Sequence, residues 1–95
     1  MIDNKLIMNY IKNKEYSKAS NIIRDEIITI LVENIKKQNS NFEYSTIKNL
    51  KDEYLKLEES IYYDSAIDLY ILSLDSKNEL YNLNILREIY SNLKK

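Results

Sequence analysis

Asp64 and Asp68 are the two residues of this sequence that come closest to a metal-binding or catalytic arrangement. They are four positions apart, so on a helix their carboxylates lie on one face and could share a divalent cation. A single pair of carboxylates is a weak indication, because solvated helix faces carry such pairs as well. Metal-dependent catalysis is therefore the third of three hypotheses, behind two binding functions.

The residue types that the sequence lacks exclude most other active-site chemistry. There is no histidine, no cysteine and no glycine. Without histidine and cysteine there is no imidazole base, no thiolate nucleophile and no conventional zinc site. Without glycine there is no phosphate-binding loop of the P-loop or Rossmann type. We therefore predict a protein that is not an enzyme and that holds no cofactor and no metal.

Charge is distributed unevenly along the chain. Residues 1–51 carry nine basic and six acidic side chains, which gives this half a net charge of +3. Residues 52–79 carry two basic and eight acidic side chains, a net charge of −6, and residues 80–95 return to +2. The middle segment is thus an acidic block in a chain whose overall net charge is only −1.

Three aspartates of this acidic block fall on one face of a predicted helix. The candidate partner-binding residues are these aspartates and the neighbouring glutamates: Asp64, Asp68, Asp75, Glu58, Glu59 and Glu79. One interpretation is the solvated outer face of a bundle helix. The other is an acidic strip that docks on a basic protein surface, where it steers association and can occupy a groove meant for nucleic acid. Reversing the charge of the three aspartates distinguishes these interpretations.

The second hypothesis is RNA binding by the basic first half of the chain, as in a small helical subunit of a ribonucleoprotein. Lysines there could contact a phosphate backbone. They are scattered, however, and the chain has only two arginines, so no basic domain results. We rank nucleic-acid binding below protein binding for this reason.

The composition favours an all-α fold in a single domain over residues 1–95. Strand-rich folds need glycine and proline at their turns, and this sequence has neither. Apolar residues at helical spacing indicate an antiparallel bundle of four to five helices around a long central helix, residues 15–38. Its apolar stripe is broad enough to need neighbours on two sides. We expect the core to contain Ile23, Ile27, Ile30, Leu31, Leu50, Leu57, Ile67, Tyr70, Leu86 and Tyr90.

Arg24 interrupts the apolar stripe of the central helix. One interpretation is an arginine whose aliphatic stem covers apolar surface while its head meets a carboxylate from another helix. The other is an anchor for an acidic group of a partner. The sequence leaves both open, and the first is the more common arrangement.

The remaining helices are predicted from caps and spacing. The first spans residues 4–13, with Asp3 as its N-cap and Asn13 as a left-handed C-cap. Phe42 and Tyr44 are expected to fold back onto the core before Ser45 caps a third helix. A fourth helix ends near residue 74, although one long bent helix is an alternative. A capping box formed by Ser76 and Glu79 opens the last helix, in which residues 83, 86, 90 and 93 share one face.

The chain resembles HEPN-type helical domains over most of its length. A short helix and a tight turn lead into Glu15-Tyr16-Ser17-Lys18-Ala19 and Ile23-Arg24-x-Glu26-Ile27-Ile28, and Ala66-Ile67-x-Leu69-Tyr70 and Lys77-Asn78 match that family's later helices. Active members are ribonucleases with an arginine followed after a few residues by histidine. Here Lys77-Asn78 is the nearest counterpart, and Asn82 stands at the histidine position. The resemblance implies a degenerate, non-catalytic member of a family common in defence and toxin–antitoxin systems and often dimeric.

We expect a cytoplasmic protein, because no signal-peptide pattern precedes the first helix and the longest apolar run, 27–32, is too short to span a bilayer. The predicted function is a small helical module that binds another protein in microbial defence or counter-defence. A homodimer stays an open alternative, and we expect no membrane partner.

Overall fold

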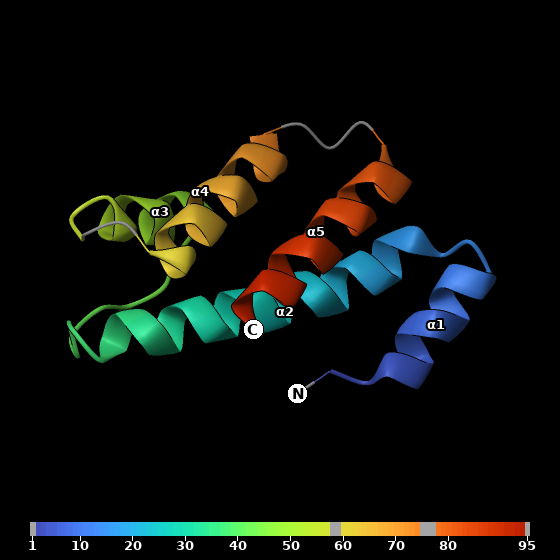
Figure 1. The fold of residues 1–95 in the computed structure, drawn as a ribbon, viewed down its shortest axis with the longest axis horizontal. Helices are drawn as coiled ribbons and strands as arrows, with labels where there is room; N and C mark the ends of the chain where they lie inside the picture. The colour runs from blue at the N-terminus through green and yellow to red at the C-terminus, as the bar shows by residue number, and fades with distance from the viewer. Residues whose placement is uncertain (1, 58–59, 75–77, 95) are drawn as a thin grey trace.

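The computed structural model describes residues 2–57, 60–74 and 78–94, and every regular element in these ranges is an α-helix (Figure 1). The helices are α1 (Asn4–Lys12), α2 (Tyr16–Lys36), α3 (Ile47–Tyr54), α4 (Ile61–Leu74) and α5 (Glu79–Leu93). The predicted all-α bundle is therefore confirmed. The third and fourth predicted helices are separate, since α3 ends at Tyr54 and α4 begins at Ile61.

The long helix α2 is the centre of the bundle, because all four other helices pack against it and α5 does so most extensively. Its fully buried apolar residues recur every fourth position and form one stripe: Ala19, Ile23, Ile27, Leu31 and Ile35. Ile30, which we placed in the core, is only half-buried. The buried stripe is narrower than predicted, because α1, α3, α4 and α5 cover different stretches of α2 along its length.

α3 is held against α2 by the side chain of Tyr54. This residue is 1% exposed, and its hydroxyl donates to the carbonyl oxygen of Leu31 at 2.7 Å. The same hydroxyl accepts a hydrogen bond from Asn34 Nδ2 at 3.0 Å. Burial raises the pKa of Tyr54 to about 12, which keeps the phenol protonated so that it can donate. Leu50 is buried beside it, while Leu57, predicted in the core, is half-buried.

The helix caps lie at or close to the predicted positions. Asp3 caps α1 as predicted, since its Oδ1 accepts from the backbone N–H of Leu6 at 3.1 Å. The left-handed residue after α1 is Lys14, with φ of 59°, and not Asn13. Thr46 caps α3 in place of Ser45, and Asn78 caps α5, while Ser76 lies outside the described residues. Caps shift in this way because several neighbouring polar side chains compete for the same free N–H groups.

Helix α4 buries a different side from the one that we predicted. Ser65, Ala66, Leu69 and Leu72 are its buried residues, whereas Ile67 and Tyr70 are only half-buried. Small residues on the inner side allow α4 to pack closely between α3 and α5. The ring of Tyr70 instead lies 4.5 Å from Lys51 Nζ of α3, a cation–π contact.

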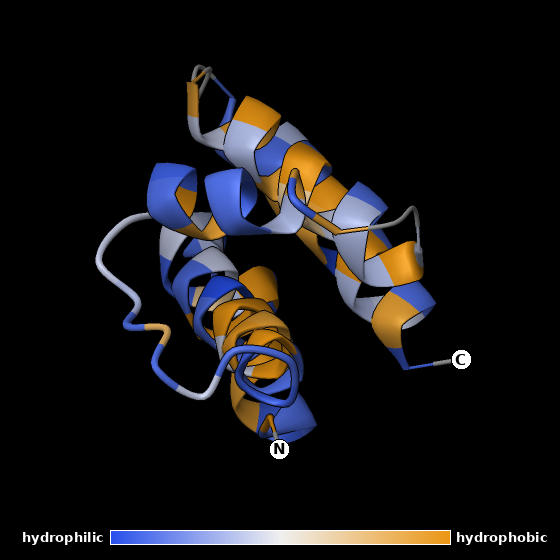
Figure 2. Cartoon of the chain, turned by 90° about the vertical axis from the view of Figure 1, so that its left-hand side faces the viewer, coloured by the Kyte–Doolittle hydropathy of each residue, from blue (hydrophilic) through white to orange (hydrophobic). Residues whose placement is uncertain are grey.

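The last helix and the loop before α3 complete the core in part as predicted. Leu83, Leu86 and Ile89 of α5 are buried, while Tyr90 is half-buried. In the 37–46 connection Phe42 is buried, but Tyr44 is 39% exposed and does not fold onto the core. Figure 2 shows α3 and this connection as largely hydrophilic, with hydrophobic residues concentrated on the other helices.

Candidate interaction surface

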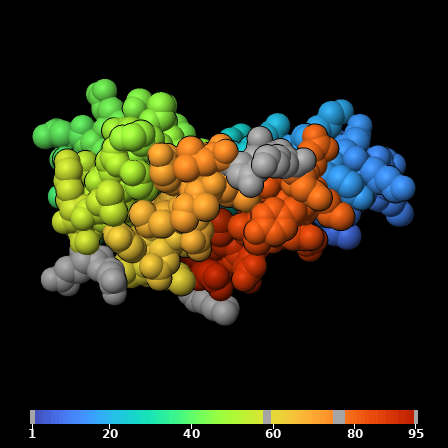
Figure 3. Space-filling model, turned by 90° about the horizontal axis from the view of Figure 1, so that it is seen from above, coloured from blue at the N-terminus to red at the C-terminus, as the bar shows by residue number. Residues whose placement is uncertain are grey.

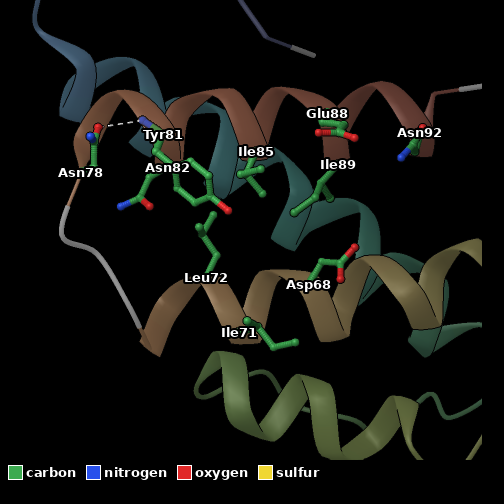
Figure 4. Close-up of a pocket in the computed structure, with 10 residues that line it drawn as sticks. All are labelled: Asp68, Ile71, Leu72, Asn78, Tyr81, Asn82, Ile85, Glu88, Ile89 and Asn92. Atoms are coloured by element: carbon green, nitrogen blue, oxygen red, sulfur yellow. Dashed lines mark hydrogen bonds between the residues drawn. The ribbon is translucent and has the colours of Figure 1, made fainter.

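A groove of about 430 Å³ lies between the antiparallel helices α4 and α5. Figure 4 shows Leu72 and Asp68 projecting from α4, and Ile89 from α5, into the space between the two helices. Figure 3 views the molecule from the side on which α4 and α5 lie next to each other. The residues that line the groove are Asp68, Ile71, Leu72, Asn78, Tyr81, Asn82, Ile85, Glu88, Ile89 and Asn92. The groove therefore combines an apolar middle with polar ends.

One end of the groove is acidic. Asp68 and Glu88 both line it, and Asp64 lies one turn before Asp68 on α4. Partial burial raises the pKa of Asp68 above its usual range, and the negative charges of Asp64 and Glu88 raise it further. Within residues 2–57, 60–74 and 78–94, these three carboxylates form no ion pair and no side-chain hydrogen bond. We call Asp64, Asp68 and Glu88 the acidic cluster.

Two other acids of the negative block, Asp52 and Glu53, are paired with lysines. Asp52 Oδ2 lies 2.8 Å from Lys48 Nζ, and its Oδ1 lies 2.7 Å from Lys51 Nζ. These hydrogen bonds lower the pKa of Asp52 to about 2. Glu53 is likewise 3.4 Å from Lys56 Nζ. Within the described part of the chain, the block's acids Asp64, Asp68 and Glu79 have no such lysine partner, and the first two belong to the acidic cluster.

The structure divides the predicted acidic strip. Asp64 and Asp68 lie together as predicted, while Asp75, Glu58 and Glu59 lie outside the described residues. Glu79 is at a different place, because its Oε1 accepts a hydrogen bond from Ser17 Oγ of α2 at 2.5 Å. This contact places Glu79 between α2 and α5, apart from Asp64 and Asp68 on α4.

Glu88 is a member of the cluster that the sequence reasoning missed. It belongs to residues 80–95, which have a positive net charge, so the net charge of this segment does not indicate an acidic site there. A helical wheel of the last helix would have placed it beside Ile85, Ile89 and Asn92. Only the packing of α5 on α4 brings it near Asp68, which is 20 positions earlier.

A second, smaller hollow lies between the first turns of α2 and α5. It has a volume of about 240 Å³ and is lined by Ser17, Ser20, Asn21, Arg24, Glu79 and Asn82. Arg24 Nη1 donates to Asn21 Oδ1 at 2.8 Å, one turn earlier on the same helix, and not to a carboxylate from another helix among the described residues. Its predicted role as an anchor for a partner stays a prediction.

Two buried polar atoms of this hollow have no hydrogen-bond partner among the described residues, namely Ser20 Oγ and Asn82 Oδ1. Such atoms in a polar crevice are commonly hydrogen-bonded by a buried water. Asn82 is also the position at which the HEPN resemblance would place a histidine. It is 7% exposed, so this position lies inside the α2–α5 interface.

The groove is bordered by apolar side chains that the bundle leaves uncovered. Ile71 and Tyr81 line it and are each 58% exposed, and near it Leu74 and Leu80 are 68% and 44% exposed. Exposed apolar side chains are ordinary when they stand alone, but a group of them beside a groove is typical of an interaction site. Sequence periodicity did not reveal this group, because α4 is apolar on nearly every side.

The described part of the chain contains no group of three or more acidic side chains placed to hold a metal ion. Asp64 and Glu88 are near enough to Asp68 to contribute to its raised pKa, but the three carboxylates do not form a group that could hold a metal ion. None of the described helices has the length and the apolar character needed to cross a membrane.

No family model, curated protein or solved structure matches this chain. The HEPN resemblance therefore stays a prediction from the sequence.

Proposed function

We propose that this protein is a non-enzymatic binding module that docks through its acidic cluster on a basic surface of another protein. The partner's surface is one that would otherwise handle nucleic acid, and the HEPN resemblance suggests a setting in microbial defence or counter-defence. The observation that carries the proposal is the grouping of Asp64, Asp68 and Glu88 without an internal cation among the described residues.

The grouping of like charges opposes folding to a small extent. Partial burial and the negative charges of Asp64 and Glu88 disfavour the ionised form of Asp68, whose pKa is raised. A lysine or arginine from a partner would remove this repulsion and gain charge-assisted hydrogen bonds. The cluster therefore favours a cationic partner both in the complex and during the approach, because a concentrated charge accelerates association at low ionic strength.

Charge reversal tests the proposal. The doubly substituted variant D64K/D68K would be compared with E33K/E43K, in which two exposed glutamates outside the groove are reversed. Tagged wild-type protein and both variants would be used to isolate partners from host cells, and the binding constant for a purified partner would be measured at several salt concentrations. We expect a basic, stoichiometric partner that is lost with D64K/D68K and retained with E33K/E43K. Equal retention by both variants would contradict the proposal.

RNA binding by the first half of the chain is the second candidate function. Lys18, Lys48 and Lys51 each lie within 3.2 Å of a carboxylate oxygen, so part of the local positive charge is already compensated. Phosphate binding depends on uncompensated cations. We expect no shift of a short RNA in a native gel at low salt, and a strong shift that disappears as salt rises would favour the RNA-binding alternative.

A further inference from the structure

We infer that the groove between α4 and α5 receives an amphipathic helix of the partner, with its apolar residues against the middle of the groove and its basic residues at the acidic cluster. This inference rests on the proposed function and specifies its mode of recognition. Three observations carry it: uncovered apolar surface, the length of the groove and the position of its charge.

The first observation is that α4 has more apolar surface than the bundle covers. Ten of its 14 residues are aliphatic or aromatic, and a helix that is apolar on all sides is normally covered on all sides. Here α3 and α5 cover two sides and α2 contacts it less extensively, and Ile71 stays 58% exposed beside the groove. Tyr81 of α5, which also lines the groove, is exposed to the same extent. A partner that covers both side chains would complete the packing of α4.

The second observation is the shape of the groove. Its lining residues on α5 extend from Asn78 to Asn92, and at 1.5 Å per residue this is roughly 21 Å, or about four helical turns. A helix lying in a groove uses apolar anchors at positions i, i+3 or i+4, and i+7, which span about two turns and so fit within this length. Ile85 and Ile89 lie four residues apart on α5 and form the matching apolar floor.

The third observation is the location of the charge, which selects the occupant. Asp68 and Glu88 are at one end of the groove, whereas the other end is lined by the uncharged amides of Asn78 and Asn82. The partner helix should therefore carry lysine or arginine near one of its ends. A second copy of this chain fits less well, because two grooves placed face to face would bring two acidic clusters into one interface.

A designed peptide tests this mode even before the natural partner is identified. The probe is a fluorescent helical peptide of about 15 residues with leucines at i, i+4 and i+7 and three lysines near one end. One control peptide has the same composition in scrambled order, and a second has glutamate in place of the lysines. Binding to the full chain would be measured by fluorescence anisotropy. We expect saturable binding of the probe and much weaker binding of both controls.

Paired variants assign the binding to the groove. I71S/Y81S removes the two exposed apolar side chains of the groove, and L55S is its control, because Leu55 is 51% exposed just after α3 and outside the groove. D68N/E88Q removes charge without changing side-chain shape, and E33Q is its control. We expect I71S/Y81S to weaken probe binding about tenfold or more. D68N/E88Q should weaken it and reduce its salt dependence, while both controls bind like wild type. Circular dichroism would verify that each variant is folded.

Several results would overturn the inference. These are absence of binding by the probe, equal binding of the scrambled or glutamate peptide, and unchanged binding by I71S/Y81S. Light scattering that shows a dimer abolished by I71S/Y81S would assign the groove to a second copy instead. If D64K/D68K loses the natural partner but the probe fails, only the helix-binding mode is wrong. If D64K/D68K retains the partner, the proposed function itself is wrong.

Discussion

The substitution Tyr54→Phe tests the account of how α3 is held on α2. Phenylalanine keeps the buried ring and its packing, so only the hydroxyl and its two hydrogen bonds are lost: the one to Leu31 O at 2.7 Å and the one from Asn34 Nδ2 at 3.0 Å. Each such bond contributes roughly 0.5–1.5 kcal/mol net. Leu31 O lies inside α2, five residues before its end, and keeps its helical hydrogen bond, and Asn34 is only half-buried. We therefore expect a loss of about 1.5 kcal/mol.

Urea unfolding followed by circular dichroism would measure this loss. In thermal unfolding of a domain of this size, a loss of about 1.5 kcal/mol corresponds to a decrease in Tm of roughly 6–12 °C. Tyr81→Phe is the control, because Tyr81 is 58% exposed and its substitution should change stability by less than about 0.5 kcal/mol. A double-mutant cycle with Asn34→Ala isolates the bond between the two side chains. If Tyr54→Phe were as stable as wild type, the hydroxyl would not hold α3 in place.

The pH dependence of stability provides a separate test of Tyr54. Its pKa is raised from 10.0 in the unfolded chain to about 12 in the folded state, so the folded state binds the proton more tightly. Stability from this group is therefore fully present below pH 10 and is lost as pH rises from about 10 to about 12. Because the other tyrosines are common to both proteins, the stability difference between wild type and Tyr54→Phe should shrink over this range. A constant difference would contradict the buried, protonated phenol.

Two further predictions concern carboxylates of the acidic block. The pKa of Asp52 is lowered from 3.8 to about 2, so its contribution to stability is present above pH 3.8 and is lost as pH falls toward 2. Asp52→Asn should therefore make acid unfolding less steep between these pH values. An acid transition identical to that of wild type would show that Lys48 and Lys51 do not stabilise the ionised Asp52. The pKa of Asp68 is raised, so its ionised form opposes folding above its folded pKa. Solvent screens this effect at an exposed carboxylate, so Asp68→Asn should increase stability at neutral pH by less than about 0.5 kcal/mol. A decrease would show that Asp68 has a favourable partner in the folded state. Thermal unfolding at pH 7 measures this effect.

Much of the fold was predictable because helix formation depends on local spacing. The apolar positions 23, 27 and 31 of α2 repeat at helical intervals with polar residues between them, so the buried side of this helix can be read from the sequence. The same holds for the cap at Asp3, where an acceptor side chain directly precedes an amphipathic stretch. The absence of glycine, histidine and cysteine is also a property of the sequence alone, and it limits the chemistry in any fold.

The buried side of α4 could not be predicted in this way. Ile67, Tyr70 and Leu74 have the same spacing as an apolar stripe, but so do other sets of residues on this helix. When nearly every position is apolar, the spacing of apolar residues does not single out one side of the helix. The helices that pack against it then decide which side is buried. In the packed bundle, the small residues Ser65 and Ala66 of α4 are buried, while Leu74 is 68% exposed.

The candidate interaction surface shows the same division between local and tertiary information. Asp64 and Asp68 are one turn apart on α4, and the sequence alone places them on a common face. Glu88 joins them, and Glu79 leaves them to meet Ser17, only because α5 crosses α2 and lies along α4. Spacing within a helix sets which of its own residues are neighbours. The electrostatic environment of a carboxylate, however, depends on every charge within several ångströms, and some of these charges come from segments that are distant in sequence and are brought close only by packing.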